Sequence, residues 1–101
     1  MIIRVFRAQI HPDRAGEFER FLRETALPLV RAQEGCLSVT AGLPLPGGPA
    51  EFCIVMVWRD LDALRAFVGE DWQHPHVLPE EEGLVVAREL SHYRGIDSIV
   101  I

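Results

Sequence analysis

The chain has 101 residues, of which 49% are hydrophobic and 25% charged, and its formal net charge is −5. A chain of this size and composition is expected to form one globular domain that buries roughly 60–70% of the surface its unfolded form exposes. The acidic charge argues against a nucleic-acid partner, because phosphate binding needs a basic face. No stretch approaches the roughly 20 apolar residues of a membrane span, and the N-terminus lacks the layout of a signal peptide. We therefore expect a cytoplasmic protein with no membrane partner.

A strand and an amphipathic helix are predicted for the first third of the chain. Residues 2–10 are rich in strand-forming side chains and end before Pro12, which begins a turn. From residue 15 to residue 30, apolar side chains recur at three- and four-residue steps, which is typical of a helix with one buried face. Asp13 is placed to cap this helix, and Pro28 should kink it.

The middle of the chain predicts a β-hairpin. Residues 36–43 alternate between apolar and polar side chains, and residues 44–49 hold three prolines and two glycines, which predicts a loop. Residues 52–58 are apolar without interruption and rich in β-branched and aromatic side chains, which predicts a strand that is apolar on both faces. The larger side chains of this strand are expected beneath the helices: Phe52, Ile54, Met56 and Trp58.

The last third predicts a second helix and a fourth strand. Asp60 can cap a helix over residues 61–68. Residues 70–83 contain two prolines and predict an ordered loop with at most a short helical turn. Residues 84–93 predict the fourth strand.

The element order β-α-β-β-α-β predicts an α+β fold of the ferredoxin-like type, in which both helices cover one face of an antiparallel sheet. The other face is apolar as well, at least along residues 52–58, so it should pack against the same face of a second copy. The sequence therefore predicts a homodimer packed sheet against sheet. Residues 1–95 form the predicted domain, and the apolar tail at residues 96–101 is expected to contact the partner protomer.

Three segments, at residues 2–8, 17–22 and 57–67, resemble the antibiotic biosynthesis monooxygenase-like domains of the dimeric α/β-barrel superfamily. The resemblance extends over nearly the whole chain. It implies a dimeric α/β barrel with a pocket between the sheet and the helices of each protomer. The activities that it implies include cofactor-independent oxygenation of aromatic compounds.

The resemblance also implies haem degradation as a possible activity. The haem-degrading relatives rely on an Asn in the first strand, a Trp in the second helix and a His shortly after that helix. The corresponding positions in this chain lie near Val5, Phe67 and His76, and the chain contains no Asn. Haem binding through His76 is therefore the third of three functional hypotheses.

The segment at residues 72–76, Trp-Gln-His-Pro-His, carries the most chemistry in the chain. In an extended backbone His74 and His76 point the same way, about 6–7 Å apart. Imidazole titrates near pH 6.5, so either side chain could remove a phenolic or enolic proton at neutral pH. The alternative is a loop in which Trp72 plugs the end of the sheet–helix layer and both histidines are solvated. A metal site would need a further ligand, so no metal is predicted.

Other residues are candidates for the wall of a substrate pocket. Arginines that lie in or beside apolar strands should be paired with a carboxylate such as Glu89 or Glu51, or with an anionic ligand. Carboxylate pairing is the favoured interpretation, and Arg59 is the arginine expected at the pocket. The predicted pocket residues are Trp72, Trp58, Met56, Phe6, Phe67 and Arg59.

These observations favour a cofactor-independent monooxygenase that acts on a small phenolic or polycyclic aromatic compound. His74 or His76 would take a proton, and an arginine would stabilise the resulting anion. The alternative from another class is a non-enzymatic dimeric protein that binds a small hydrophobic or oxidised metabolite, as in a stress response.

Overall fold

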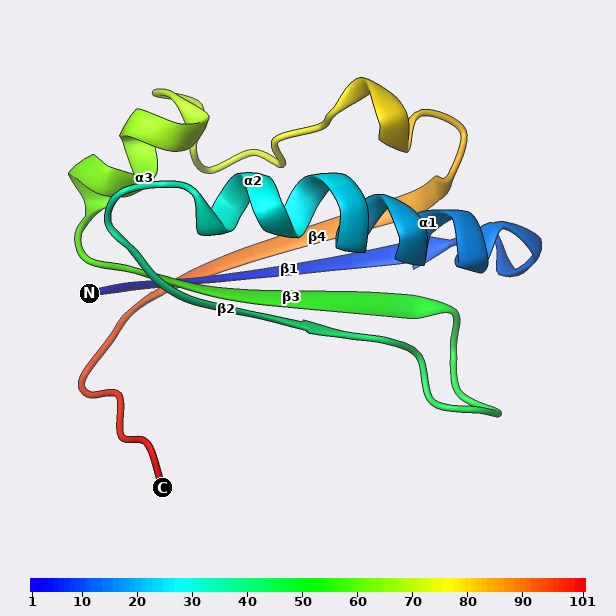
Figure 1. Ribbon diagram of the computed structural model, residues 1–101, viewed down its shortest axis with the longest axis horizontal. Helices are drawn as coiled ribbons and strands as arrows, with labels where there is room; N and C mark the ends of the chain where they lie inside the picture. The colour runs from blue at the N-terminus through cyan, green and yellow to red at the C-terminus, as the bar shows by residue number, and fades with distance from the viewer.

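The computed structural model describes residues 1–101 and has the predicted ferredoxin-like α+β architecture (Figure 1). Its four strands form one antiparallel sheet in the order β2-β3-β1-β4. The helices all lie on one face of this sheet, and the other face is uncovered. The strands are β1 (Ile2–Ile10), β2 (Cys36–Gly42), β3 (Glu51–Trp58) and β4 (Val85–Arg94), each within one residue of its predicted bounds.

Strand β1 lies inside the sheet and fixes the register of the site. It pairs with β3 on one side and with β4 on the other. Arg4 lies opposite Met56 on β3 and opposite His92 on β4. Residues directly opposite each other in a sheet point to the same face, so these three side chains share the helix-covered side.

The predicted first helix is present, but it has a wider turn in its middle. Helix α1 (Ala15–Phe21) is followed by a π-helical turn, η2 (Leu22–Ala26), and by α2 (Leu27–Arg31). In the turn, the Leu27 N–H donates to the Leu22 carbonyl, five residues earlier. The wider turn stands directly before Pro28, which has no N–H to donate, so the helix continues through the proline.

The capping prediction for this helix is wrong. Asp13 lies inside a short 3₁₀ turn, η1 (Pro12–Arg14), and no side chain caps either η1 or α1. Pro12 starts the helical path two residues earlier than expected, because its fixed φ suits the first helical position.

The second helix begins as predicted. In α3 (Leu61–Val68) the Asp60 carboxylate accepts a hydrogen bond from the Ala63 N–H at 2.8 Å. The helix ends at Gly69, whose φ of 88° lies in the left-handed region that favours glycine. The following loop contains one short 3₁₀ turn, η3 (Pro79–Glu81), as expected. None of the helices has the length and apolar character needed to span a bilayer.

The two faces of the sheet differ in burial. Phe52, Ile54, Met56 and Trp58 of β3 are all buried under the helices, which confirms the predicted orientation of this strand. The alternate side chains, such as Val55, are half-buried on the uncovered face.

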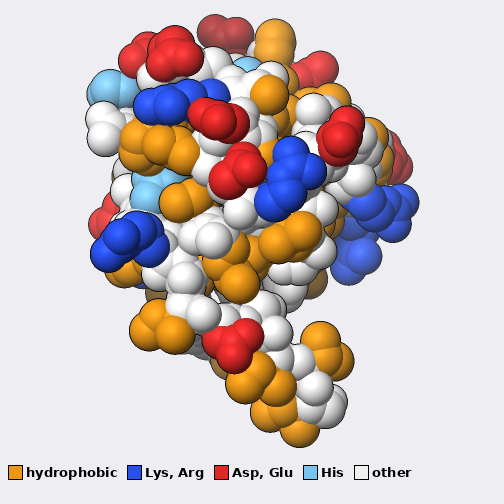
Figure 2. All heavy atoms as spheres, turned by 90° about the vertical axis from the view of Figure 1, so that its left-hand side faces the viewer, with side chains coloured by type: hydrophobic (Ala, Val, Ile, Leu, Met, Phe, Trp, Pro, Cys, Tyr) orange, Lys and Arg blue, Asp and Glu red, His pale blue; other side chains and the backbone are white.

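Beyond β4 the tail at residues 96–101 extends away from the body of the protein (Figures 1 and 2). Its apolar side chains are fully or largely exposed: Ile96, Ile99, Val100 and Ile101.

Candidate active site

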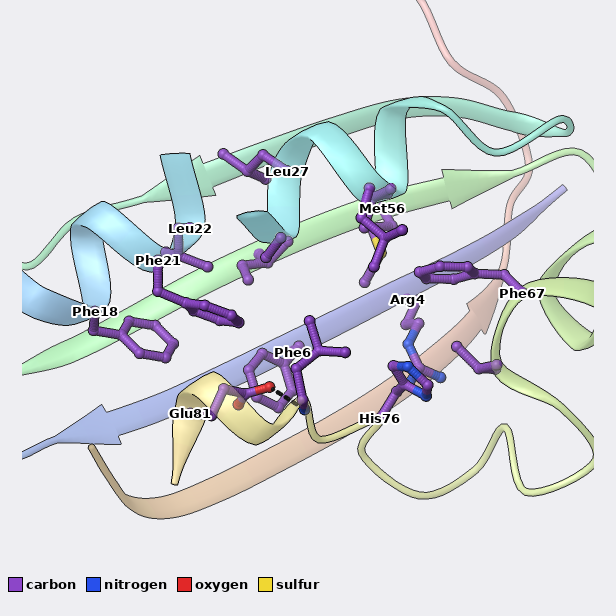
Figure 3. A pocket seen from close by; sticks show the side chains of 16 residues that line it. Arg4, Phe6, Phe18, Phe21, Leu22, Leu27, Met56, Phe67, His76 and Glu81 are labelled. Atoms are coloured by element: carbon purple, nitrogen blue, oxygen red, sulfur yellow. Dashed lines mark hydrogen bonds between the residues drawn. The ribbon is translucent and has the colours of Figure 1, made fainter. Parts of the chain in front are cut away.

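A cavity of about 80 Å³ lies between the sheet and the helices (Figure 3). It is lined by 16 residues, of which 13 are hydrophobic. The three polar or charged lining residues are Arg4, His76 and Glu81. Leu29 and His76 are also exposed, so the cavity opens to solvent beside them. An apolar lining with a few convergent polar groups is typical of a small-molecule site, whereas a volume of about 80 Å³ is below the roughly 300–1,000 Å³ of such sites, so a ligand with two rings requires the open side of the cavity to widen.

Arg4 is the most deeply buried charged residue in the protein, with 3% of its surface exposed. Its Nη1 donates to the Trp72 carbonyl oxygen at 2.5 Å and contacts His92 Nε2 at 2.9 Å. Its Nη2 donates to the His74 carbonyl oxygen at 3.4 Å. The guanidinium thus connects β1, the loop after α3 and β4. Two of its five N–H groups, the Nε–H and one on Nη2, make no hydrogen bond within the protein.

No carboxylate forms an ion pair with Arg4. Burial lowers the pKa of its guanidinium to about 10, so Arg4 is still a cation at neutral pH. The predicted carboxylate pairing holds for other arginines: Arg7 pairs with Glu89 at 3.0 Å, and Arg88 with Glu81 at 3.4 Å. Buried charges are normally paired, so the exception at Arg4 points to a function.

His92 holds the guanidinium of Arg4 from the neighbouring strand. A guanidinium can only donate, so His92 Nε2 must be the acceptor, and Nδ1 carries the proton of the neutral ring. Burial, with a smaller effect from the Arg4 charge, lowers the pKa of His92, which favours this neutral form. The indole of Trp72 packs edge-on against the His92 ring at 5.0 Å between centroids.

His76 lies at the mouth of the cavity. Its ring centroid is 5.7 Å from that of Phe67, which also lines the cavity. The Phe67 ring stacks in turn on Trp58, with 5.4 Å between centroids. His76 is therefore solvent-accessible on one side and in contact with the aromatic wall on the other, a position from which a base can exchange its proton with water.

Glu81 contributes a carboxylate to the same cavity, with 5% of its surface exposed. One of its oxygens accepts the Leu78 N–H at 2.9 Å, and the other lies 3.4 Å from Arg88 Nη2. In the view of Figure 3, Phe6 lies between Glu81 and Arg4.

Four of the predicted site residues lie in the cavity wall, namely Phe6, Met56, Phe67 and His76. The other predicted side chains do not line it. Trp58 is fully buried behind Phe67, and Trp72 packs on His92. His74 has an exposed side chain that contacts Asp71 at 3.5 Å, and Arg59 is exposed beside Asp60.

The two predicted histidines separate because their loop is not extended. The His74 N–H donates to the Asp71 carbonyl oxygen at 2.9 Å, which closes a turn and directs the side chains of His74 and His76 differently.

Sequence reasoning considered Arg4 only as one of the strand arginines that need a carboxylate or an anionic ligand, and it did not place Arg4, His92 or Glu81 in the pocket. The sequence carried a signal for Arg4, because Ile2, Phe6, Ala8 and Ile10 share its face of β1 and a charge interrupts that apolar series. His92 is recognisable only once the β1–β4 register is known. Nothing in the run at residues 80–82 distinguishes the middle Glu from its neighbours.

The structure contains no cluster of three or more His, Cys, Asp or Glu side chains that could hold a metal ion. Cys36 and Cys53 are unpaired and half-buried. Burial raises the pKa of the Cys36 thiol, so it has little thiolate character at neutral pH.

Comparison with known proteins agrees with this architecture. The model of the family "Antibiotic biosynthesis monooxygenase" matches residues 1–77, and the chain therefore belongs to this family. None of the curated proteins matches the chain by sequence.

Several solved structures have the same fold. A candidate antibiotic biosynthesis monooxygenase from Deinococcus radiodurans has a TM-score of 0.76 and 21% identity, and the match covers 100% of this chain and 98% of that one. SnoaB, a cofactor-independent oxygenase from Streptomyces nogalater, has a TM-score of 0.72 and 22% identity over 97% and 95% of the two chains. A mutant of MhuD with two manganese protoporphyrins bound per active site has a TM-score of 0.75 and 14% identity over 99% of each chain. These identities support a shared fold and do not by themselves assign an activity.

Proposed function

We propose that the protein is a cofactor-independent monooxygenase that acts on a small phenolic or other electron-rich aromatic compound. The observation that carries this proposal is Arg4, a buried cation without a carboxylate partner in the wall of an otherwise apolar cavity. Such a group stabilises negative charge that develops on a bound substrate, because it is already oriented and shielded from water. Membership of the family and the likeness to SnoaB support the reaction class.

The proposed chemistry uses His76 at the mouth of the cavity and Arg4 in its buried wall. His76 takes a proton from an activated C–H or O–H group of the substrate and passes it to solvent. Arg4 holds the oxygen on which the negative charge of the resulting anion rests. The anion then reduces O₂ itself, and collapse of the peroxide leaves one oxygen atom in a new carbonyl group and the other in water. All electrons come from the substrate, so the proposed reaction needs no redox cofactor.

The two histidines provide a matched test of this mechanism. Oxygen uptake is measured with a panel of anthrones and hydroquinones, for the wild type and for the His76→Ala and His74→Ala variants. We expect His76→Ala to lose about 100-fold to 10,000-fold in kcat, as is typical for a general base. His74→Ala should stay within about twofold, because its side chain lies outside the cavity. No turnover in the wild type, or equal rates in both variants, contradicts the proposal.

A non-enzymatic binding role is the alternative, and it predicts a pocket without titratable groups and two histidines that face solvent. Both histidines are exposed, but the cavity contains three titratable groups, namely Arg4, His76 and Glu81, which favours the enzyme. Haem degradation is the weaker alternative, since the resemblance implies an Asn near Val5 and a Trp near Phe67, the chain has no Asn, and Val5 is on the uncovered face of the sheet. Titration with haemin, which produces a Soret band if His76 binds iron, tests this role.

We also propose that the protein is a homodimer packed through the uncovered face of the sheet. This face carries half-buried apolar side chains of β1 and β3, among them Val5 and Val55, which lie directly opposite each other. Apolar surface of this kind is stabilised by a partner. In this arrangement the exposed apolar tail at residues 96–101 lies on the partner protomer. Light scattering that gives a monomer at micromolar concentration contradicts the dimer.

A cytoplasmic location is part of the proposal. The reducing cytoplasm keeps thiols such as Cys36 and Cys53 unpaired, as they are in the structure.

A further inference from the structure

The charged groups of the cavity differ in whether the protein neutralises them. Arg4 has no carboxylate within ion-pair distance, whereas Glu81 has Arg88 at 3.4 Å. Within the chain, therefore, no carboxylate neutralises the guanidinium of Arg4. The unliganded cavity therefore has one uncompensated positive charge. A ligand that neutralises it must carry one negative charge.

The groups of Arg4 that are free for a ligand match an oxyanion. The Nη1 atom and one hydrogen of Nη2 are occupied by Trp72, His92 and His74. The Nε–H and the second Nη2–H remain, and a carboxylate or a phenolate oxygen can accept them. His92 and the two loop carbonyls hold the guanidinium in place, so its position is set before the ligand arrives.

Glu81 and Arg4 lie at different positions along the direction of β1, which are called levels of the cavity below. Its partner Arg88 is on β4 opposite Ala8 of β1, whereas His92 is opposite Arg4. Four residues separate these two levels, which corresponds to about 13 Å along a strand. The ring of Phe6 lies between them and offers an apolar surface to the body of a ligand.

The Glu81 carboxylate keeps acceptor capacity for a ligand. Its two oxygens have about four lone-pair sites, and the contacts with Leu78 and Arg88 use two of them. Because Arg88 already supplies a counter-charge, the ligand group that Glu81 accepts is a neutral donor such as a hydroxyl and not a second cation.

We propose that the cavity binds an aromatic monoanion that carries its oxyanion at Arg4 and a hydroxyl group at its far end, where Glu81 accepts it. Glu81 is then a specificity-determining residue that selects ligands with an oxygen function at both ends. This inference rests on the proposed function only in taking the cavity as the substrate site.

The test measures binding without oxygen, so that no reaction is required. Three probes separate the two ends: a hydroxynaphthoate whose hydroxyl and carboxylate lie on opposite rings, naphthoate without the hydroxyl, and naphthol without the carboxylate. At neutral pH we expect the wild type to bind hydroxynaphthoate at least about tenfold more tightly than naphthoate, and naphthoate at least about tenfold more tightly than naphthol. Calorimetry under nitrogen gives these ratios.

Two substitutions assign the preferences to residues. Glu81→Gln keeps an acceptor for the Leu78 N–H but removes the charge, so the hydroxyl preference should fall several-fold; Glu81→Ala should abolish it. Arg4→Gln should abolish the preference for naphthoate over naphthol. Because each ratio is measured on one protein, partial unfolding of a variant does not change it. A wild type without either preference, or Glu81 variants that keep the hydroxyl preference, would overturn the inference.

The same data separate this inference from the oxygenase proposal. If the binding ratios appear but no phenol supports oxygen uptake, the ligand class stands and the oxygenase proposal fails. If oxygen uptake occurs but the ratios are near one, the oxygenase proposal stands and the ligand class fails.

Discussion

Arg4 and Arg7 are three residues apart on β1, so their side chains lie on opposite faces of the sheet. Their electrostatic surroundings differ as well. Arg7 has a side chain that is 42% exposed and pairs with Glu89 at 3.0 Å. Arg4 is 3% exposed and has no carboxylate. An exposed pair contributes about 0–1 kcal/mol, whereas a buried cation without a counter-ion costs folding free energy. The helix-covered face thus holds a charge that is available for binding, and the uncovered face holds one that Glu89 neutralises.

The largest expected effect on activity comes from removing the charge of Arg4, and the same substitution at Arg7 is its control. We expect Arg4→Met to lower kcat/KM for a phenolic substrate by at least about 100-fold, as for the loss of a preorganised oxyanion donor. Arg7→Met should stay within about twofold, because Arg7 does not reach the cavity. Steady-state oxygen uptake measures both.

Thermal unfolding of the same two variants checks that the loss is functional. In Arg4→Met, relief of the desolvation cost offsets the lost hydrogen bonds, so Tm should shift by less than about 5 °C. If Arg4→Met retains activity within tenfold of the wild type, Arg4 is no more important for the reaction than Arg7, although only Arg4 lies on the helix-covered face.

The uncovered face can be tested through the proposed dimer. Val55 lies at the centre of this face, opposite Val5 on β1 and Thr40 on β2. We expect Val55→Asp to weaken dimerisation by about 100-fold or more, because an unpaired carboxylate would have to leave water at the interface. Leu45→Asp, in the exposed loop between β2 and β3, is the control and should leave the dimer unchanged. A dimer that survives Val55→Asp has its interface elsewhere.

The fold could be predicted because its signals are local. The uninterrupted apolar strand at residues 52–58, the helical spacing at residues 61–68 and the cap at Asp60 each specify one element. The prediction that failed, the cap at Asp13, depends on where the preceding proline starts the helical path. The fixed φ of Pro12 favours this earlier start, a preference that the expected cap at Asp13 did not take into account.

The site was less predictable because its polar groups come from four segments that meet only in the folded protein. His76 and Phe67 were recognised from residue type, but so were Trp72 and His74, whose side chains point elsewhere. Whether an aromatic residue lines a cavity or packs behind another depends on tertiary contacts that a single sequence does not specify.

The smallest expected effect concerns His92, which shares the cavity face with Arg4. Burial and the Arg4 charge lower its folded-state pKa below the 6.5 of the unfolded chain. The unfolded chain therefore binds more protons than the native state once the pH falls below about 6.5, and stability decreases from there until the pH passes the folded-state pKa. His92→Gln supplies an oxygen that can accept from Arg4 but does not titrate, so the free energy of unfolding should depend less on pH between about 5.5 and 7.5. Urea denaturation across this range measures the slope, with the exposed His11→Gln as the control. If the pH dependence of the free energy of unfolding is unchanged in His92→Gln, the Arg4–His92 contact does not exclude the protonated imidazole. The helix-covered face would then tolerate a protonated His92 beside the Arg4 cation.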